Sequence, residues 1–316
     1  MAVDVASVVV VGSVNVDLIV RSERLPRPGE TVVGGDLLTA GGGKGANQAM
    51  AAHRLGADVR FIARIGHDGP GDFVQTSFES ERLSSRWLTV DPVAATGVAL
   101  ILVDRRGENV ISVAPGANAR LRPDDVRAAE DAFDGARVLL VQLEIPIETV
   151  RTALEIARTR GIITVLNPAP ARPVPDDLLR LVEWLTPNET EAAMLGAPSG
   201  DRSEARRGAH ALRARGPSGV VVTLGERGAV AEAAEGTIDL EPFSVAAIDT
   251  TAAGDAFSAG LAVGLARGMA APEALRYASA AGALTTTRQG AQPSLPRDDE
   301  VRKLLESRRF GDRIRG

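Results

Sequence analysis

The chain has 316 residues, of which 44% are hydrophobic and 24% charged, and this is ordinary for a globular protein with a sizeable core. A net charge of −5 argues against nucleic acid as the main partner, and the absence of cysteine excludes disulfides and thiolate metal sites. No apolar run approaches the roughly 20 residues that span a bilayer, and the N-terminus lacks a cleavable signal. We therefore expect a cytoplasmic protein with no membrane partner.

Short apolar runs alternate with helical segments along most of the chain. The first run, Ser7–Val11, is typical of a buried strand. Further strands are expected at 60–65, 137–142, 162–166, 183–185 and 219–224. Helices are expected after the stretch at 40–49 as far as about 55, and at about 72–82, 123–133, 148–160, 253–267 and 277–287. This alternation predicts an α/β fold with a mostly parallel central sheet and helices on both faces. The Arg-rich tail from 302 to 316 is expected to be a solvated or frayed terminus.

Two β-rich segments interrupt the alternation. The first, about 14–40, contains turns and short strands at 18–20 and 31–35, but no helix. The second, about 95–114, has the pattern of a hairpin with strands at 96–103 and 109–113. The two segments could pair, which predicts a single α/β domain over 1–316 with a small β-sheet lid.

Polar residues follow two of the expected strands. Asn15 and Asp17 come directly after the first strand, at positions i and i+2 of an extended segment, so both can face the same side. Ligands of open α/β sheets bind beyond the carboxyl ends of the strands, and an amide with a carboxylate would suit a polyol. The alternative is that both are ordinary turn residues. Glu144 occupies a similar place after the strand at 137–142.

A glycine-rich stretch at 41–49 precedes an Ala-rich helix. It is not a Walker A loop, because Gly45 stands where Ser or Thr is required after Gly-Lys. Gly41, Gly43 and Ala46 match a dinucleotide-binding fingerprint in form, although no apolar strand is expected to lead directly into them. Of the 36 Lys and Arg residues only Lys44 and Lys303 are lysines, so a lysine kept within this loop indicates a specific role.

A second stretch, 249–257, follows a β-like run and opens a long Ala/Gly/Leu helix. Ala252, Ala253 and Gly254 are small enough to let a phosphate approach the helix N-terminus, whose free N–H groups attract anions. Asp255 lies beside that position and could take a proton from a hydroxyl that attacks the phosphate. The alternative is that Asp255 is only a helix cap.

These stretches resemble the signatures of the ribokinase (phosphofructokinase-B) family of sugar kinases. Residues 249–255 resemble its C-terminal signature D-T-x-G-A-G-D, with Ala252 where many members have glycine, and residues 42–48 resemble its N-terminal signature G-G-K-G-A-N-Q. Further likeness lies at 142–146, 167–171, 188–191 and 290–294, so the resemblance covers nearly the whole chain.

The resemblance implies an ATP-dependent kinase with Mg²⁺ and K⁺, D-ribose as the first guess for the substrate, and a lid that covers the sugar and forms a homodimer contact. Another sugar or a nucleoside stays an alternative, with a dinucleotide-dependent oxidoreductase and a non-catalytic sugar-binding protein as remote ones. Asp255 is then the general base, beside an anion hole at 253–255, and Ala252, Ala253 and Gly254 complete the implied catalytic residues. The implied sugar-binding residues are Asn15, Asp17, Gly43, Lys44, Gly45, Asn47, Glu144 and Asp255.

The same resemblance assigns the nucleotide and the two cations. Glu191 would hold Mg²⁺ through water. The implied nucleotide-binding residues are Asn188, Thr223, Gly225, Glu226, Gly228, Gly254 and Ser279. The implied monovalent-cation site comprises Asp249, Thr251, Thr285, Arg288, Gly290 and Ser294.

Overall fold

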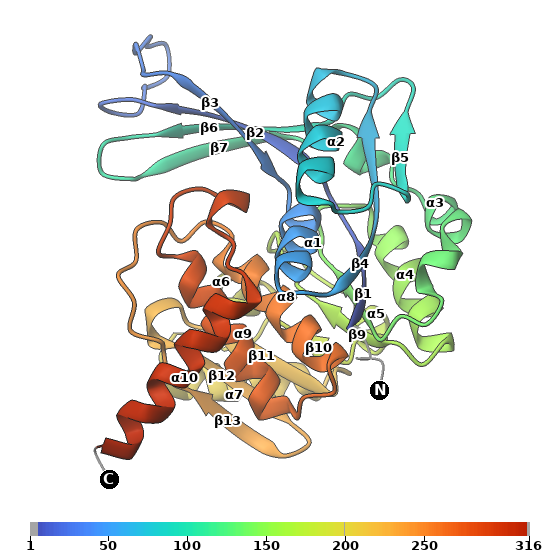
Figure 1. The fold of residues 1–316 in the computed structure, drawn as a ribbon, viewed down its shortest axis with the longest axis vertical. Helices are drawn as coiled ribbons and strands as arrows, with labels where there is room; N and C mark the ends of the chain where they lie inside the picture. Colours follow the sequence, from blue (N-terminus) through green and yellow to red (C-terminus); the bar gives the residue numbers. More distant parts are fainter. Residues whose placement is uncertain (1–5, 199, 315–316) are drawn as a thin grey trace.

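A nine-stranded sheet forms the body of the protein in the computed structural model, which describes the main chain of residues 6–198 and 200–314 and side chains as far as residue 307 (Figure 1). The strand order is β13-β12-β11-β10-β9-β8-β1-β4-β5. Neighbours from β11 to β5 pair in parallel, whereas β12 and β13 are antiparallel. The strands are β1 (Ser7–Val11), β4 (Asp58–Gly66), β5 (Leu88–Asp91), β8 (Val138–Val141), β9 (Ile163–Leu166), β10 (Trp184–Leu185), β11 (Gly219–Thr223), β12 (Ala229–Ala233) and β13 (Gly236–Leu240).

Helices cover both faces of this sheet, as the alternating pattern predicts. Successive residues of β1 point to opposite faces, so Val8 and Val10 join one buried cluster while Val9 and Val11 join the other. The first cluster packs against α1 (Lys44–Arg54), α2 (Gly69–Glu81), α8 (Ala253–Ala266), α9 (Ala271–Thr285) and α10 (Asp298–Ile314). The second packs against α3 (Pro123–Ala128), α4 (Ile147–Thr159), α5 (Asp176–Leu179), α6 (Glu189–Met194) and α7 (Arg202–Arg213).

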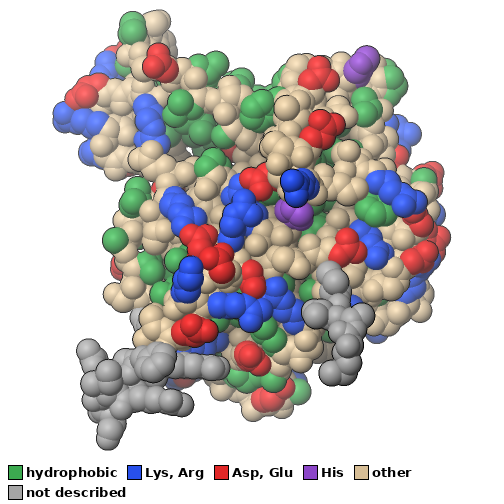
Figure 2. All heavy atoms as spheres, in the orientation of Figure 1, with side chains coloured by type: hydrophobic (Ala, Val, Ile, Leu, Met, Phe, Trp, Pro, Cys, Tyr) green, Lys and Arg blue, Asp and Glu red, His purple; other side chains and the backbone are tan. Residues whose placement is uncertain are grey.

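A separate four-stranded sheet projects from the body and forms the predicted lid. Its order is β3-β2-β6-β7, with β2 and β6 parallel and the outer pairs antiparallel (Figure 1). The strands are β2 (Asn15–Arg21), β3 (Leu37–Gly42), β6 (Gly97–Val103) and β7 (Asn109–Ala114). Hydrophobic side chains gather on this sheet, while charges of both signs are interspersed over the face of the body in Figure 2.

Two local expectations were wrong. The strand expected at 31–35 lies at Leu37–Gly42, directly before α1, so an apolar strand does lead into the glycine-rich stretch. Residues 241–252 contain no strand, because the chain there runs as a loop from the sheet to α8. The tail continues α10 as far as Ile314, and three acids in the first turn favour the N-terminus of this helix. Arg302, Lys303, Glu306 and Ser307 are exposed, in line with the expected solvated tail. Among the described residues, no helix is both long and apolar enough to cross a bilayer.

Candidate active site

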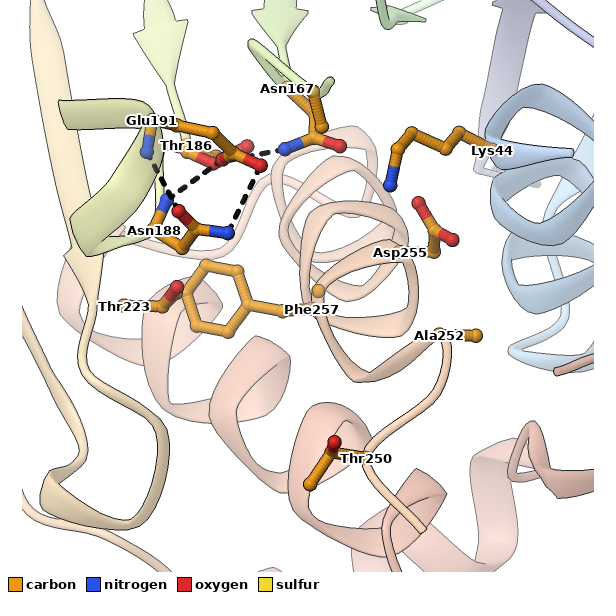
Figure 3. A pocket seen from close by; sticks show the side chains of 12 residues that line it. Lys44, Asn167, Thr186, Asn188, Glu191, Thr223, Thr250, Ala252, Asp255 and Phe257 are labelled. Carbon is orange, nitrogen blue, oxygen red and sulfur yellow. Dashed lines mark hydrogen bonds between the residues drawn. The ribbon is translucent and has the colours of Figure 1, made fainter. Parts of the chain in front are cut away.

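A cavity of about 180 Å³ lies at the carboxyl ends of the parallel strands, beside the N-terminus of α8 (Figure 3). It brings together residues from four of the predicted groups: the sugar site, the nucleotide site, the Mg²⁺ site and the helix N-terminus. In Figure 3, Lys44 from α1 and Asp255 from α8 point toward one another across one side of it. Its lining consists of Lys44, Asn167, Ala169, Thr186, Asn188, Glu191, Thr223, Thr250, Ala252, Gly254, Asp255 and Phe257.

The Asp255 carboxylate is buried and held by two amides. Its side chain is only 5% exposed. Asn47 Nδ2 donates to Oδ2 and Gln48 Nε2 donates to Oδ1, each at 3.0 Å. Burial raises the pKa of Asp255, while the Lys44 ammonium and the two amides favour the ionised form. A carboxylate in this state is suited to accept a proton.

Lys44 supplies positive charge within a ring of carboxylates. The negative charge of Asp255 raises the pKa of Lys44 despite its burial, and Glu144 and Glu191 act in the same direction. The Lys44 main-chain N–H donates to Glu144 Oε2 at 2.9 Å, and Ser13 Oγ donates to the same oxygen at 2.5 Å. Glu144 therefore ties the start of α1 to the segment after β1.

The predicted sugar residues Asn15 and Asp17 lie on β2, at the base of the lid. Burial, with the nearby charges of Glu144 and Asp255, raises the pKa of Asp17 to about 6. A Cβ atom added to Gly42 would lie 2.2 Å from Asp17 Oδ1, so the glycine leaves room for this carboxylate. Asn118 Nδ2 donates to Asn15 Oδ1 at 2.8 Å and fixes that amide.

The N-terminus of α8 departs from a regular cap. Ala252 is the N-cap residue and has a left-handed backbone, with φ of 61°. The N–H of Ala253 donates to the Thr250 carbonyl at 3.2 Å, which engages one of the three predicted anion-hole donors in a turn. The N–H groups of Gly254 and Asp255 are therefore the better candidates for an anion, because first-turn N–H groups have no partner within the helix.

Asn188 and Glu191 form a reciprocal capping box at the start of α6. Asn188 N–H donates to Glu191 Oε2 at 2.9 Å, and Glu191 N–H donates to Asn188 Oδ1 at 2.8 Å. Burial raises the pKa of Glu191, whose carboxylate lies at the cavity wall (Figure 3). An acidic oxygen here fits a Mg²⁺ ion held through water, so the capping and the metal interpretations are compatible.

The predicted nucleotide residues divide into two sets. Asn188, Thr223 and Gly254 line the cavity, and a β-bridge joins Asn188 to Thr223. The remaining four lie outside the cavity lining: Gly225, Glu226, Gly228 and Ser279. Gly225 and Glu226 form a 3₁₀ turn after β11, whereas Ser279 lies on α9 with its hydroxyl donated to the Leu275 carbonyl at 2.9 Å.

Two of the predicted monovalent-cation residues, Thr251 and Gly290, donate hydrogen bonds to the Asp249 carboxylate. Its Oδ1 accepts from Thr251 N–H at 2.9 Å and from Thr251 Oγ1 at 2.6 Å, and its Oδ2 accepts from Gly290 N–H at 2.9 Å. Thr285 and Ser294 are fully buried. The Arg288 guanidinium pairs with Glu300, so the group of Arg288 that could contact a cation is its main-chain carbonyl. Asp249 thus joins the loop before α8 to the loop after α9.

Comparison with known proteins places this geometry in a family. The model of the pfkB family of carbohydrate kinases matches residues 5–298. The chain is 40% identical to a ribokinase of Haemophilus influenzae, covering 94% of this chain and 97% of that protein. It is also 34% identical to a deoxyribokinase of Salmonella typhimurium, covering 94% and 98%. The structure of Arabidopsis thaliana ribokinase complexed with ribose and ATP superposes with a TM-score of 0.87 at 30% identity, covering 95% and 99%.

The chain belongs to the pfkB family of carbohydrate kinases. The resemblance of its motifs to that family and the expected ribokinase-like fold with a small lid are both confirmed. It is an ATP-dependent carbohydrate kinase, which excludes the oxidoreductase and the non-catalytic alternatives. The glycine-rich stretch at 41–46 therefore belongs to a pfkB kinase and not to a dinucleotide fold.

Several polar residues of the site were not predicted. Gln48, Gln142 and Asn167 lie within the stretches that resemble the family, so their positions were visible although their roles were not. Asn118 gave no signal, because it reaches Asn15 from a 3₁₀ turn 103 residues away. The other unpredicted residues of the site are Ser13, Ala169, Thr186, Thr250 and Phe257.

Proposed function

We propose that this pfkB kinase transfers the γ-phosphoryl group of ATP to the primary 5-hydroxyl of D-ribose, giving ribose 5-phosphate and ADP. The observation that carries the proposal is the single cavity that holds the buried Asp255 carboxylate, the Lys44 ammonium and the N-terminus of α8. The sugar partner is supported by the similarity to ribokinases over nearly the whole chain. Another pentose such as deoxyribose, another sugar or a nucleoside stays the alternative.

In the proposed reaction, Asp255 accepts the proton of the sugar hydroxyl while the oxygen of that hydroxyl forms a bond to the γ-phosphorus. The bond from that phosphorus to the bridging oxygen of ADP breaks at the same time. The N–H groups of Gly254 and Asp255, with Ala253 as the weaker third donor, stabilise charge on the transferring group, and Lys44 adds a positive charge. Mg²⁺ near Glu191 would neutralise the nucleotide phosphates.

The other predicted residues have holding roles in this proposal. Asn15, Asp17, Gly43, Gly45, Asn47 and Glu144 would bind the sugar beneath the lid. Exclusion of water by the lid would suppress wasteful ATP hydrolysis. A K⁺ ion bound near Asp249 would hold the loop that leads into α8 and would do no chemistry. We further propose a cytoplasmic homodimer that forms through the lid.

The test is ADP release with MgATP and a panel of sugars led by D-ribose, on the wild type and on Asp255→Asn. We expect ribose-dependent turnover and a loss of about 10²–10⁴ in kcat in the variant, with the melting temperature retained. Turnover with a different sugar would keep the mechanism and change the substrate. Full activity of a folded Asp255→Asn protein would refute the base assignment.

A further inference from the structure

Two consecutive residues of α1 hold the two oxygens of the Asp255 carboxylate. Asn47 donates to Oδ2 and Gln48 donates to Oδ1, each at 3.0 Å. Each carboxylate oxygen has two lone pairs, so these amides leave a free lone pair on each oxygen for a substrate hydroxyl. The pair of donors on one rigid helix therefore sets the rotation of the carboxylate plane.

The direction of the Gln48 amide follows from the main chain. The Thr186 carbonyl can only accept, so the Asn167 side chain must turn its NH₂ group toward it, at 3.1 Å. This leaves Asn167 Oδ1 as an acceptor, which Gln48 Nε2 meets at 3.1 Å. Gln48 must therefore present its NH₂ group, and not its oxygen, to both Asn167 and Asp255.

A third amide secures the same direction from the other side. Gln142 Nε2 donates to Gln48 Oε1 at 2.6 Å. Gln142 Oε1 is buried and has no hydrogen-bond partner among the described residues, an arrangement that costs free energy. A Cβ atom at Gly12 would lie 2.1 Å from this oxygen, so the glycine leaves room for it. The amide group of Gln142 thus donates to Gln48 through Nε2, while its Oε1 makes no hydrogen bond among the described residues.

We propose that Gln48 is a positioning residue, whose fully buried amide fixes the rotation of the Asp255 carboxylate and favours its ionised form. Gln48 acts through Asp255 and does not line the cavity. The inference rests on the proposed role of Asp255 as general base. The charged groups that face Asp255 are Lys44 from α1, Asp17 from β2, Glu144 after β8 and Glu191 from α6.

The test measures kcat, KM and the pH dependence of kcat in Gln48→Met, which has a similar length but no donor. We expect kcat to fall about 10–100-fold while KM for sugar and ATP changes by less than about 3-fold. The acid limb of the kcat profile should move to higher pH, because the ionised carboxylate loses a donor. In Gln48→Glu, which retains the side-chain shape, the limb should move further because a second acid competes for ionisation.

Two comparisons make the result specific. Combined with Asp255→Asn, the Gln48→Met change should have no further effect on kcat beyond about 2-fold, because its target is gone. Thr149→Val, on α4, removes another buried hydrogen bond, which Thr149 Oγ1 donates to the Leu121 carbonyl at 2.6 Å. This variant should leave the pH profile of kcat unchanged.

The inference is overturned if folded Gln48→Met or Gln48→Glu keeps the wild-type pH profile, or if Gln48→Met lowers kcat equally with and without Asp255. Because Gln48→Glu is nearly isosteric, it decides the matter where the methionine variant does not fold. Wild-type turnover in Asp255→Asn alone would instead refute the proposed function, and that measurement does not involve Gln48.

Discussion

At the start of α8, an alanine, Ala252, occupies a left-handed position that favours glycine, while a glycine, Gly254, occupies a helical position that favours alanine. Ala252 adopts a left-handed conformation with φ of 61°, which favours glycine and costs alanine roughly 1–2 kcal/mol. Gly254 lies in an ordinary helical turn, and a Cβ atom added to it would meet no atom within 4 Å. The glycine is therefore not required by the protein's own packing. Gly254 lines the cavity, where a phosphate would need the space.

Gly254→Ala is predicted to separate stability from activity. Alanine is favoured over glycine in a helix by up to about 1 kcal/mol, so the free energy of unfolding should stay equal or rise. The added methyl group would block the approach of the γ-phosphoryl group to the N–H donors, so kcat/KM should fall about 10²–10³-fold. Thermal unfolding and steady-state kinetics on the same preparation measure both effects.

Gly69→Ala is the matched control for this prediction. Gly69 begins α2, and a Cβ atom there also meets no atom within 4 Å. Its substitution should leave kcat/KM unchanged, because Gly69 does not line the cavity. Equal activity of the two variants would show that no ligand approaches Gly254 closely.

The fold followed from local patterns where those patterns and the tertiary structure agree. Apolar runs such as Ser7–Val11 become central parallel strands because both faces of the sheet are covered. The β-branched residues near 31–35 predicted a strand that the structure instead places at Leu37–Gly42. In that register Gly41 lies against Gln292 and Gly42 against Asp17. These contacts depend on distant residues, so the local sequence could not reveal them.

The sequence predicted those site residues that belong to short motifs, but not those that distant segments contribute. Lys44 and Asp255 were singled out by residue type and position and Glu191 by the family resemblance, and the fold brings all three to one cavity. Asn118 and the amide chain through Gln48 arise from contacts between segments more than 90 residues apart. A neutral amide can serve anywhere in a protein, so its residue type alone does not indicate such a role.

The lid is predicted to be a dimer interface that a charge disrupts. Leu37 and Leu38 are adjacent on β3 and are 59% and 49% exposed, so apolar side chains lie on both faces of this sheet. Asp17 pairs with Ala99 and lies on the face toward the sugar site, so Leu100 lies on the opposite face. We expect this opposite face to contact a second copy of the chain. Leu100→Glu should convert a dimer to a monomer in sedimentation velocity, because burying an unpaired charge is costly.

Val93→Glu is the control for the lid variant, since Val93 is 78% exposed and lies outside the lid sheet. This change should leave the sedimentation coefficient unaltered. If the wild type sediments as a monomer at every concentration, the proposed lid dimer is wrong.

Activation by K⁺ is predicted to depend on Asp249. At constant ionic strength, the wild type should turn over faster in K⁺ than in a bulky organic cation, because K⁺ would order the loop before α8. In Asp249→Ala the hydrogen bonds to Thr251 and Gly290 are lost, and the K⁺ response should largely disappear. Asp239→Ala, which removes a carboxylate paired with Arg206 away from the cavity, should keep it. A K⁺ response that survives in Asp249→Ala would exclude this site.

Asp17 is predicted to lower stability at neutral pH in exchange for sugar binding. Its pKa is raised from 3.8 to about 6, chiefly by burial, so the folded state binds a proton more tightly than the unfolded state. Below pH 3.8 Asp17 is protonated in both states and does not lower the free energy of unfolding. The destabilisation grows as the pH rises and is complete above about pH 6. The shift corresponds to about 3 kcal/mol at pH 7.5.

Asp17→Asn should therefore raise the free energy of unfolding at pH 7.5 by up to about 3 kcal/mol and should give little gain near pH 4. The same variant should raise KM for the sugar, because a carboxylate that accepts from hydroxyls is lost. Urea denaturation at the two pH values measures the stability change, with the exposed Asp36→Asn in the same segment as the control. A gain that is equal at both pH values would show that the stabilisation does not come from the ionisation of Asp17.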